Sequence, residues 1–118
     1  MWQSSLRIIF GRVMGKTIYI SLPIAGLDLQ EQIAHAENIE KTLEHFYDKV
    51  LNPFDNGVPL DAHPSLHMRA DFKMLLEADA IFMSDGWEES SGCVAEWTVA
   101  KSCHMDIKYE SDTAKYFR

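Results

Sequence analysis

Short apolar runs alternate along the chain with longer segments in which apolar residues recur every three or four positions. The first pattern is typical of buried strands and the second of amphipathic helices. Strands are predicted over residues 17–21, 50–52, 79–84 and 105–109, and helices over 28–47, 66–78 and 92–104. Strands that alternate with helices imply right-handed βαβ units. We therefore expect an α/β fold with a parallel sheet and helices on both of its faces.

Turn and capping signals mark the boundaries between these elements. Pro23 ends the first strand, and Asp28 followed by Glu31 makes a capping-box start for the first helix. Pro53 closes the second strand, and residues 54–64 carry three turn signals. A long loop is therefore expected between the second strand and the second helix.

Composition and charge limit the class of partner. The chain has 118 residues, the size of one ordinary domain, and 47% of them are hydrophobic. The formal net charge of −7 argues against a nucleic-acid polymer, because contacts to a phosphate backbone need a basic face. A small phosphorylated ligand is not excluded, since it needs only a few local donors. No apolar run is long enough for a transmembrane helix, so no membrane partner is expected.

The first residues and the cysteines bear on the cellular setting. Residues 1–14 lack the long apolar core and the small-residue cleavage site of a signal peptide. Cys93 and Cys103 do not have the spacing of a zinc site or of a disulfide framework. We therefore expect a reducing, cytoplasmic setting.

None of the histidines is predicted to bind a metal ion. His63 and His67 have the spacing of two ligands on one helix face, but Pro64 between them breaks the helical register. His35 and His45 are expected to be ordinary residues on the faces of the first helix. The sequence therefore predicts no metal site.

The expected ligand site lies at one edge of the sheet, because ligands of parallel sheets collect outside the carboxyl ends of the strands. The loops at 22–27 and 85–91 follow the first and third predicted strands, and the third helix starts at the same edge. Ser90, Ser91 and Gly92 stand at this helix start, where free backbone N–H groups attract anions. A pocket between these segments is the predicted site.

Glu96 is the central candidate for chemistry in that pocket. It lies within the first turn or so of the third helix, where the helix dipole favours the ionised carboxylate. Its pKa is therefore expected near or below the free value of about 4.3. An ionised carboxylate in a concave site can act as a nucleophile at an anomeric carbon. The alternative is that Ser90 or Ser91 simply caps the helix and Glu96 is a solvated acid.

Two further residues have competing interpretations. Asp71 lies on the helix before the third strand, and it reaches the pocket only if the start of that helix faces the site. Otherwise it is a surface acid that pairs with Arg69 or Lys73. Trp87, in the polar loop, either stacks on a base or sugar or anchors the loop.

Four segments together resemble the nucleoside 2-deoxyribosyltransferase superfamily. They are IYISLPIAG at 18–26, NP at 52–53, HMRADFKMLLEADAIFM at 67–83 and GWEESSGCVAEWTVA at 86–100. The resemblance covers about residues 16–110 and is closest to a short branch named only as a domain of unknown function. It implies a flavodoxin-like or Rossmann-like three-layer sandwich, with residues 16–118 as one domain. Residues 1–15 are then an N-terminal extension that is either not native or disordered.

The same resemblance implies a reaction at an N-glycosidic bond. In the characterised relatives, a glutamate at the position of Glu96 attacks C1′ of the deoxyribose, and a tyrosine that maps to Tyr19 orients it. An aspartate that maps to Asp71 assists at the sugar or base, and a serine that maps to Ser90 contacts a 5′-phosphate. No cofactor is implied, and a homo-oligomer, dimer or larger, is expected. The residues expected to bind the nucleoside or nucleotide are Ser21, Pro23, Gly26, Asp85, Trp87, Ser90 and Gly92.

Two positions depart from the pattern of these relatives. Leu22 stands where they usually carry glycine and is expected to narrow the pocket, and Ala25 replaces an arginine that binds phosphate in the hydrolases. Three functions are therefore weighed: cleavage or deoxyribosyl transfer at a nucleoside or nucleotide, a non-catalytic nucleotide-sensing module, and a scaffold with a vestigial pocket. Leu22 and Ala25 favour the last two, whereas the intact set of implied site residues favours the first.

Overall fold

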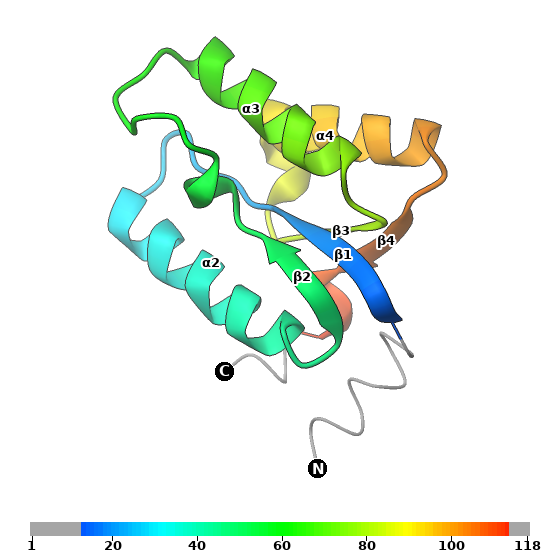
Figure 1. Cartoon of the computed structure of the whole chain (residues 1–118). Helices are drawn as coiled ribbons and strands as arrows, with labels where there is room; N and C mark the ends of the chain where they lie inside the picture. Colours follow the sequence, from blue (N-terminus) through cyan, green and yellow to red (C-terminus); the bar gives the residue numbers. More distant parts are fainter. Residues whose placement is uncertain (1–12, 114–118) are drawn as a thin grey trace.

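The structure, a computed structural model, describes residues 13–113. Four parallel strands form one sheet in the spatial order β2-β1-β3-β4. They are β1 (Val13–Ser21), β2 (Tyr47–Leu51), β3 (Ala80–Met83) and β4 (Asp106–Tyr109). Helix α2 (Leu29–Leu43) covers one face, and α3 (Pro64–Leu76) and α4 (Ser91–Ser102) cover the other (Figure 1). The predicted parallel α/β fold is confirmed, and its layers are those of a flavodoxin-like or Rossmann-like sandwich.

Three short 3-10 helices lie in the connections: η1 (Pro53–Asp55), η2 (Trp87–Glu89) and η3 (Glu110–Asp112). Most element ends lie within a few residues of the predicted ones. None of the helices described between residues 13 and 113 is long and apolar enough to cross a membrane.

Side-chain alternation along β1 divides the core into two halves. Ile18 and Ile20 point towards α2 and belong to one buried cluster, whereas Tyr19 points towards α3 and α4 and belongs to the other. Ser21 lies two residues after Tyr19 and therefore on the same face, and both side chains are fully buried. The end of β1 thus presents two hydroxyl groups to the layer formed by α3 and α4.

Strand β1 starts earlier than the predicted strand at 17–21. It begins at Val13, and its pairing with β2 shifts register between Val13 and Thr17. Gly15, inside this stretch, has a φ of 76°, which interrupts regular strand alternation. This irregularity hides the start of the strand from a pattern-based prediction. Residues 1–12, most of the predicted extension at 1–15, lie outside the described residues.

The first helix is shorter than predicted. Asp28 caps it as expected, because its Oδ1 accepts a hydrogen bond from the N–H of Glu31 at 2.9 Å. The predicted end at Tyr47 is wrong, since α2 stops at Leu43 and Tyr47 begins β2. Phe46 and Tyr47 pack in the same buried cluster as the apolar residues of α2. They are apolar because they are buried in this core, and not because they continue the helix. Apolar spacing alone does not distinguish a last helical turn from the entry to a strand.

The start of α3 also differs from the prediction, which treated Pro64 as a break in the helix. Pro64 instead occupies the first helical position, where a missing N–H group has no intrahelical partner to lose. His63 caps the helix, with its Nδ1 accepting a hydrogen bond from the N–H of Ser65 at 3.1 Å. Within residues 13–113, no group of three or more His, Cys, Asp or Glu side chains is placed to hold a metal ion.

The strand order creates a crevice at the carboxyl edge of the sheet. The chain passes from β1 to β2 on one side and then crosses to β3 on the other side of β1. Loops that leave neighbouring strands in opposite directions leave space between them, and ligands of doubly wound folds bind there. Ser21 of β1 pairs in register with Met83 of β3, so both strands end at the same level.

Candidate active site

Glu96 reaches the carboxyl edge of the sheet from the buried face of α4. Cys93, Glu96 and Ala100 recur at helical spacing and are the buried residues of this helix. Glu96 is only 4% exposed, so the alternative of a solvated acid is wrong. Ser90 does cap α4, because its Oγ accepts a hydrogen bond from the N–H of Cys93 at 3.3 Å.

Both oxygens of the Glu96 carboxylate are held by hydroxyl groups from β1. The Tyr19 hydroxyl donates to Oε2 at 2.5 Å, and the Ser21 hydroxyl donates to Oε1 at 2.8 Å. Tyr19 and Ser21 are two residues apart on one strand, so their side chains point to the same face of the sheet. Both hydroxyl groups can therefore reach the same carboxylate. The structure therefore brings Tyr19 and Glu96 together, as the family resemblance implied. Ser21 was expected to bind substrate, but it is fully buried, is not among the lining residues of the cavity described below, and holds Glu96 instead.

The predicted pKa of Glu96 is wrong in direction. Burial raises the pKa of this carboxyl group to about 7, although the hydrogen bonds from Tyr19 and Ser21 favour the ionised form, and the negative charge of Asp71 raises it further. The helix dipole has little effect because α4 is capped at Ser90, which places Glu96 in the second turn. Burial also raises the pKa of Tyr19 well above its ordinary value, so this phenol remains a donor.

Asp71 lies at the same site. It is 9% exposed, and its Oδ1 accepts a hydrogen bond from Nδ2 of Asn56 at 2.8 Å. Burial raises the pKa of this carboxyl group, although Asn56 and His67 both act to lower it. Within residues 13–113 Asp71 takes part in no ion pair, so the alternative of a surface acid paired with Arg69 or Lys73 is wrong.

A cavity of about 1030 Å³ opens over these residues. Its walls come from the loops that follow β1, β2 and β3, from the first turns of α3, and from the start of α4. Asp71 and Glu96 both line it. A cavity of this size is sufficient for a nucleoside-sized ligand.

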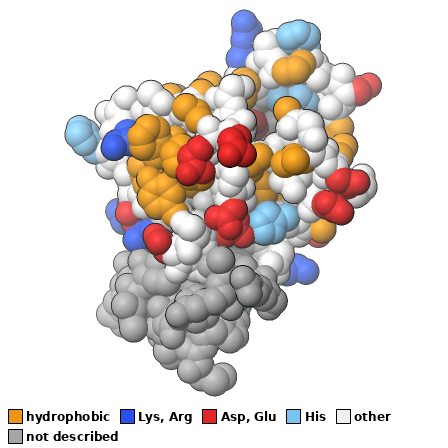
Figure 2. All heavy atoms as spheres, turned by 180° about the vertical axis from the view of Figure 1, so that it is seen from behind, with side chains coloured by type: hydrophobic (Ala, Val, Ile, Leu, Met, Phe, Trp, Pro, Cys, Tyr) orange, Lys and Arg blue, Asp and Glu red, His pale blue; other side chains and the backbone are white. Residues whose placement is uncertain are grey.

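The charged groups of the cavity are almost all acidic. Its lining includes four carboxyl groups and one imidazole, and none of the described lining residues is Lys or Arg. The carboxyl groups belong to Asp71, Asp85, Glu89 and Glu96. On the side of the molecule seen in Figure 2, acidic side chains also lie across the middle and basic ones towards the margins. The cavity therefore favours neutral or positively charged ligand groups over anionic ones.

The other residues predicted to bind substrate divide into two groups. Pro23, Asp85, Ser90 and Gly92 line the cavity, whereas Gly26 and Trp87 are not among the lining residues. Gly26 has a φ of 79° and serves the turn after β1. The Trp87 ring stacks on Trp97 with 5.3 Å between centroids and lies 6.0 Å from the ring of Tyr109. This packing corresponds to the interpretation of Trp87 as an anchor for its loop.

Leu22 and Ala25, the two positions that depart from the relatives, have different consequences. Leu22 is 5% exposed and packs mainly with the buried cluster under α2, although it also lines the cavity. The expectation that Leu22 narrows the cavity stays a prediction. Ala25 lines the cavity and brings no cation to it.

Sequence reasoning missed one wall of the cavity, the connection that follows β2. Phe54 and Asn56 line the cavity from this connection, and His67 faces them from α3. A signal for this wall was present, because β2 is parallel to β1 and β3 and ends at the same edge. The predicted site used only the loops after the first and third strands.

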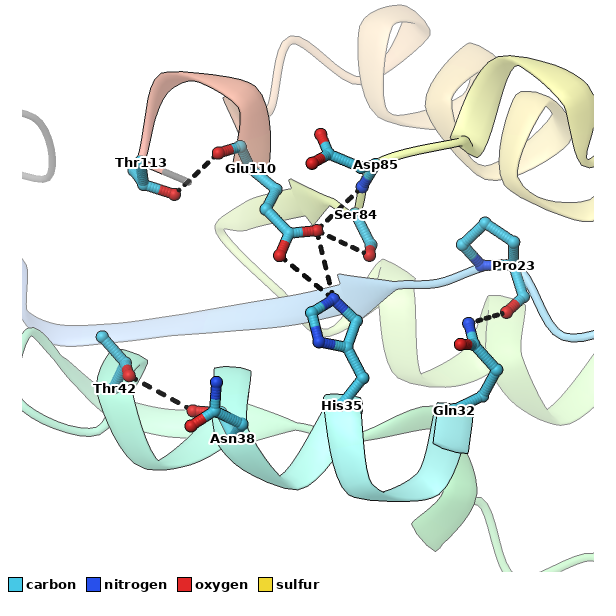
Figure 3. Close-up of polar contacts among 9 residues, drawn as sticks. All are labelled: Pro23, Gln32, His35, Asn38, Thr42, Ser84, Asp85, Glu110 and Thr113. Carbon is cyan, nitrogen blue, oxygen red and sulfur yellow. Dashed lines mark hydrogen bonds and ion pairs between the residues drawn. The ribbon is translucent and has the colours of Figure 1, made fainter. Parts of the chain in front are cut away.

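Sequence reasoning also missed a second polar cluster, formed by His35, Ser84, Asp85 and Glu110 (Figure 3). Glu110 is 4% exposed, and its Oε1 accepts hydrogen bonds from the hydroxyl of Ser84 and the N–H of Asp85, each at 2.9 Å. Nε2 of His35, on α2, lies 3.0 Å from its Oε2. Burial acts to raise the pKa of Glu110, but these contacts outweigh it and the pKa is lowered, while the hydrogen bond to Glu110 raises the pKa of His35. The cluster fixes the start of the loop that carries Asp85 into the cavity.

The chain matches the model of a protein family. A family model described as a domain of unknown function, DUF4406, matches residues 16–109. No curated protein matches the chain. The matched range contains the site from Tyr19 to Glu96 together with most of the described sheet. Because this range is most of the sequence, the chain belongs to the DUF4406 family.

Proposed function

We propose that this protein cleaves or transfers the N-glycosidic bond of a nucleoside, with Glu96 as the nucleophile. The observation that carries the proposal is the buried Glu96 carboxylate, whose two oxygens are oriented by Tyr19 and Ser21 beside a nucleoside-sized cavity. The likeness of Tyr19, Asp71 and Glu96 to the nucleoside 2-deoxyribosyltransferase superfamily supports it. On this proposal the DUF4406 family is a branch of that superfamily.

The reaction takes place in two displacements. A carboxylate oxygen of Glu96 attacks C1′ of the sugar, the C1′–N bond breaks, and its electron pair leaves with the base. The departing base takes its proton from solvent water, and Asp71, which lines the same cavity, holds that water in place. Water or a second base then attacks C1′, loses its proton to Asp71 and releases Glu96. The acidic cavity stabilises the positive charge that develops on the sugar in both steps.

The charge of the cavity supports a nucleoside without a 5′-phosphate as the substrate. A phosphate would enter a site with four carboxyl groups and no Lys or Arg among its described lining residues. Ser90, the residue implied to contact a phosphate, already caps α4. These carboxyl groups would repel a phosphate when they are ionised, but they would not repel a neutral 5′-hydroxyl group.

The second candidate function is a sensing module that binds a nucleoside without turnover. The raised pKa of Glu96 favours it, because a carboxyl group with a pKa of about 7 is half protonated at neutral pH and then is not a nucleophile. Binding requires only the shape and hydrogen-bonding groups of the cavity. Turnover separates the two functions.

The test is incubation with 2′-deoxynucleosides, ribonucleosides and their 5′-monophosphates, with free base measured by chromatography. We expect release from at least one nucleoside, weaker release from its monophosphate, and a loss of about 10³-fold or more in Glu96→Gln. Asp112→Asn, an exposed change outside the cavity, is the control. Equal release by wild type and Glu96→Gln would overturn the nucleophile, and saturable binding without release would establish the sensing module.

A further inference from the structure

The side chain of Asn56 is oriented by contacts on both of its ends. Its Oδ1 accepts a hydrogen bond from the N–H of Val58 at 2.9 Å. A backbone N–H can only donate, so this contact fixes which end of the amide is the oxygen. Nδ2 therefore faces the cavity wall, 2.8 Å from Oδ1 of Asp71 and 3.2 Å from Nδ1 of His67.

This orientation determines the tautomer of His67. An amide nitrogen donates hydrogen bonds and does not accept them, so Nδ1 of His67 must be the acceptor. The neutral ring then carries its hydrogen on Nε2. Nε2 has no hydrogen-bond partner within the described residues and is not buried, and the ring lines the cavity. His67 thus offers a free N–H donor to a ligand.

His67 and Asp71 lie one turn apart on α3 and share the same amide. Residues four apart on a helix lie on one face, so both side chains meet the cavity on its α3 wall. Asp71 is the group that serves the departing base in the proposed reaction. A donor next to it faces the same part of the ligand.

We propose that His67 recognises the base of the substrate through Nε2–H, and that Asn56 is the positioning residue that sets this tautomer. The inference rests on the proposed function. The acceptor on the ligand is a ring nitrogen or carbonyl oxygen of a nucleobase. Electron density on that atom rises as the N-glycosidic bond breaks, so the hydrogen bond is stronger in the transition state than in the bound substrate.

The tautomer is measured by long-range ¹H–¹⁵N correlation spectra of the full chain at a pH where the ring is neutral. We expect Nε2–H for His67 in the wild type, a lower Nε2–H fraction in Asn56→Ala, and Nδ1–H in Asn56→Asp, because a carboxylate accepts where the amide donated. His63 is the internal control, since its Nδ1 accepts from the N–H of Ser65 and should stay the Nε2–H tautomer in every variant. Nδ1–H at His67 in the wild type, or no change in either variant, would overturn the positioning role.

Base recognition is tested by titration with free adenine, hypoxanthine, cytosine and thymine. We expect the Nε2–H resonance of His67 to move with the same saturation curve as the methyl resonance of Met68, which also lines the cavity. His67→Phe keeps a ring but removes the donor, and should weaken base binding by about tenfold. No binding by any base, or saturation at Met68 without movement at His67, would overturn base recognition.

The two proposals fail in different ways. If bases bind through His67 but no nucleoside is turned over, base recognition stands and the enzymatic function fails. If nucleosides are turned over while the resonance of His67 stays unmoved, the enzymatic function stands and base recognition fails.

Discussion

Glu96 and Glu110 are equally inaccessible to solvent, yet their pKa values move in opposite directions. Each is 4% exposed. Burial raises the pKa of Glu96 to about 7, whereas the pKa of Glu110 is lowered despite its burial. Two causes account for the difference: the Glu96 carboxyl lies deeper among protein atoms than that of Glu110, and the partners differ. Glu96 meets two neutral hydroxyls with Asp71 nearby, while Glu110 meets the imidazole of His35 together with a hydroxyl and a backbone N–H.

The surroundings distinguish a carboxylate beside a cavity, Glu96, from one that joins structural elements, Glu110. The hydrogen bonds to Glu96 orient it without neutralising it, and one side of its surroundings is an open cavity. The negative charge of such a carboxylate can stabilise a positive charge that develops on a ligand. Glu110 is instead enclosed by its partners His35, Ser84 and the N–H of Asp85, so its contacts join α2, the end of β3 and η3.

The largest effect on stability is expected from Glu110→Gln. The change removes the charge opposite His35 and leaves the groups around Ser84 and Asp85 with a poorer acceptor, at a cost of about 3 to 4 kcal/mol. Denaturant unfolding at pH 6 measures it. Asp112→Asn, exposed on the same 3-10 helix, is the control and should stay within about 0.5 kcal/mol. A loss at Glu110 no larger than that of the control would contradict its structural role.

The opposite sign is expected for Glu96→Gln. A folded-state pKa raised above the unfolded value means that the wild type loses stability as pH rises from about 4.5 through 7. The variant has no such loss, so it should be more stable by about 2 to 3 kcal/mol at pH 8 and unchanged near pH 4. Unfolding free energies at the two pH values measure this. Glu89→Gln, an exposed change at the same cavity, should show no such pH-dependent gain. A Glu96→Gln variant that is less stable than the wild type at pH 8 would show that the ionised Glu96 carboxylate does not destabilise the fold.

The proposed reaction gives a pH profile that follows from the same pKa. Glu96 must be ionised to attack, so kcat/KM for a nucleoside should rise about tenfold per pH unit below pH 7 and level off above it. Initial rates of base release between pH 5 and 8.5 measure the profile. A profile that is flat across this range would show that the titration of Glu96 does not control the reaction.

A smaller effect is expected from His35→Gln. The pair contributes most between the ordinary pKa values of its members, 4.5 and 6.5. The contribution of Glu110 to the free energy of unfolding is lost as pH falls through its lowered pKa. The contribution of His35 is lost as pH rises through its raised pKa. The variant should lose about 1 kcal/mol near pH 6, because a partly exposed pair is screened by solvent. The free energy of unfolding, measured as a function of pH, should vary less in the variant than in the wild type. An unchanged pH dependence would show that His35 and Glu110 are not coupled.

The fold and the centre of the site could be predicted from the sequence for a physical reason. The contact of Tyr19 with Glu96 was implied by the family resemblance, whereas that of Ser21 was not predicted. Strand alternation places both hydroxyls on one face, and parallel strands end at one edge, which explains both contacts. The pKa of Glu96 could not be predicted in the same way, because it depends on burial that only the tertiary structure defines. Neither the expected homo-oligomer nor the cytoplasmic setting is tested by the fold, and both stay predictions.

The missed residues are those whose contacts join distant parts of the chain. His35 and Glu110 are 75 positions apart, and nothing in the local pattern around either one indicates the other. Asn56 lies in a connection whose path depends on turns and not on periodicity, so its contacts with His67 and Asp71 were hidden. In both cases polar side chains from different helices, strands or connections form hydrogen bonds with one another.

The most direct test asks which carboxylate forms a bond to the sugar. The protein is incubated with a 2-deoxy-2-fluoro nucleoside, a substrate class that slows the breakdown of a glycosyl-enzyme, and is then digested and mapped by mass spectrometry. We expect one sugar attached to the peptide that contains Glu96 and no adduct in Glu96→Gln. A sugar on Glu110 or Asp71, or release of base with no adduct on Glu96 at any time, would contradict this expectation.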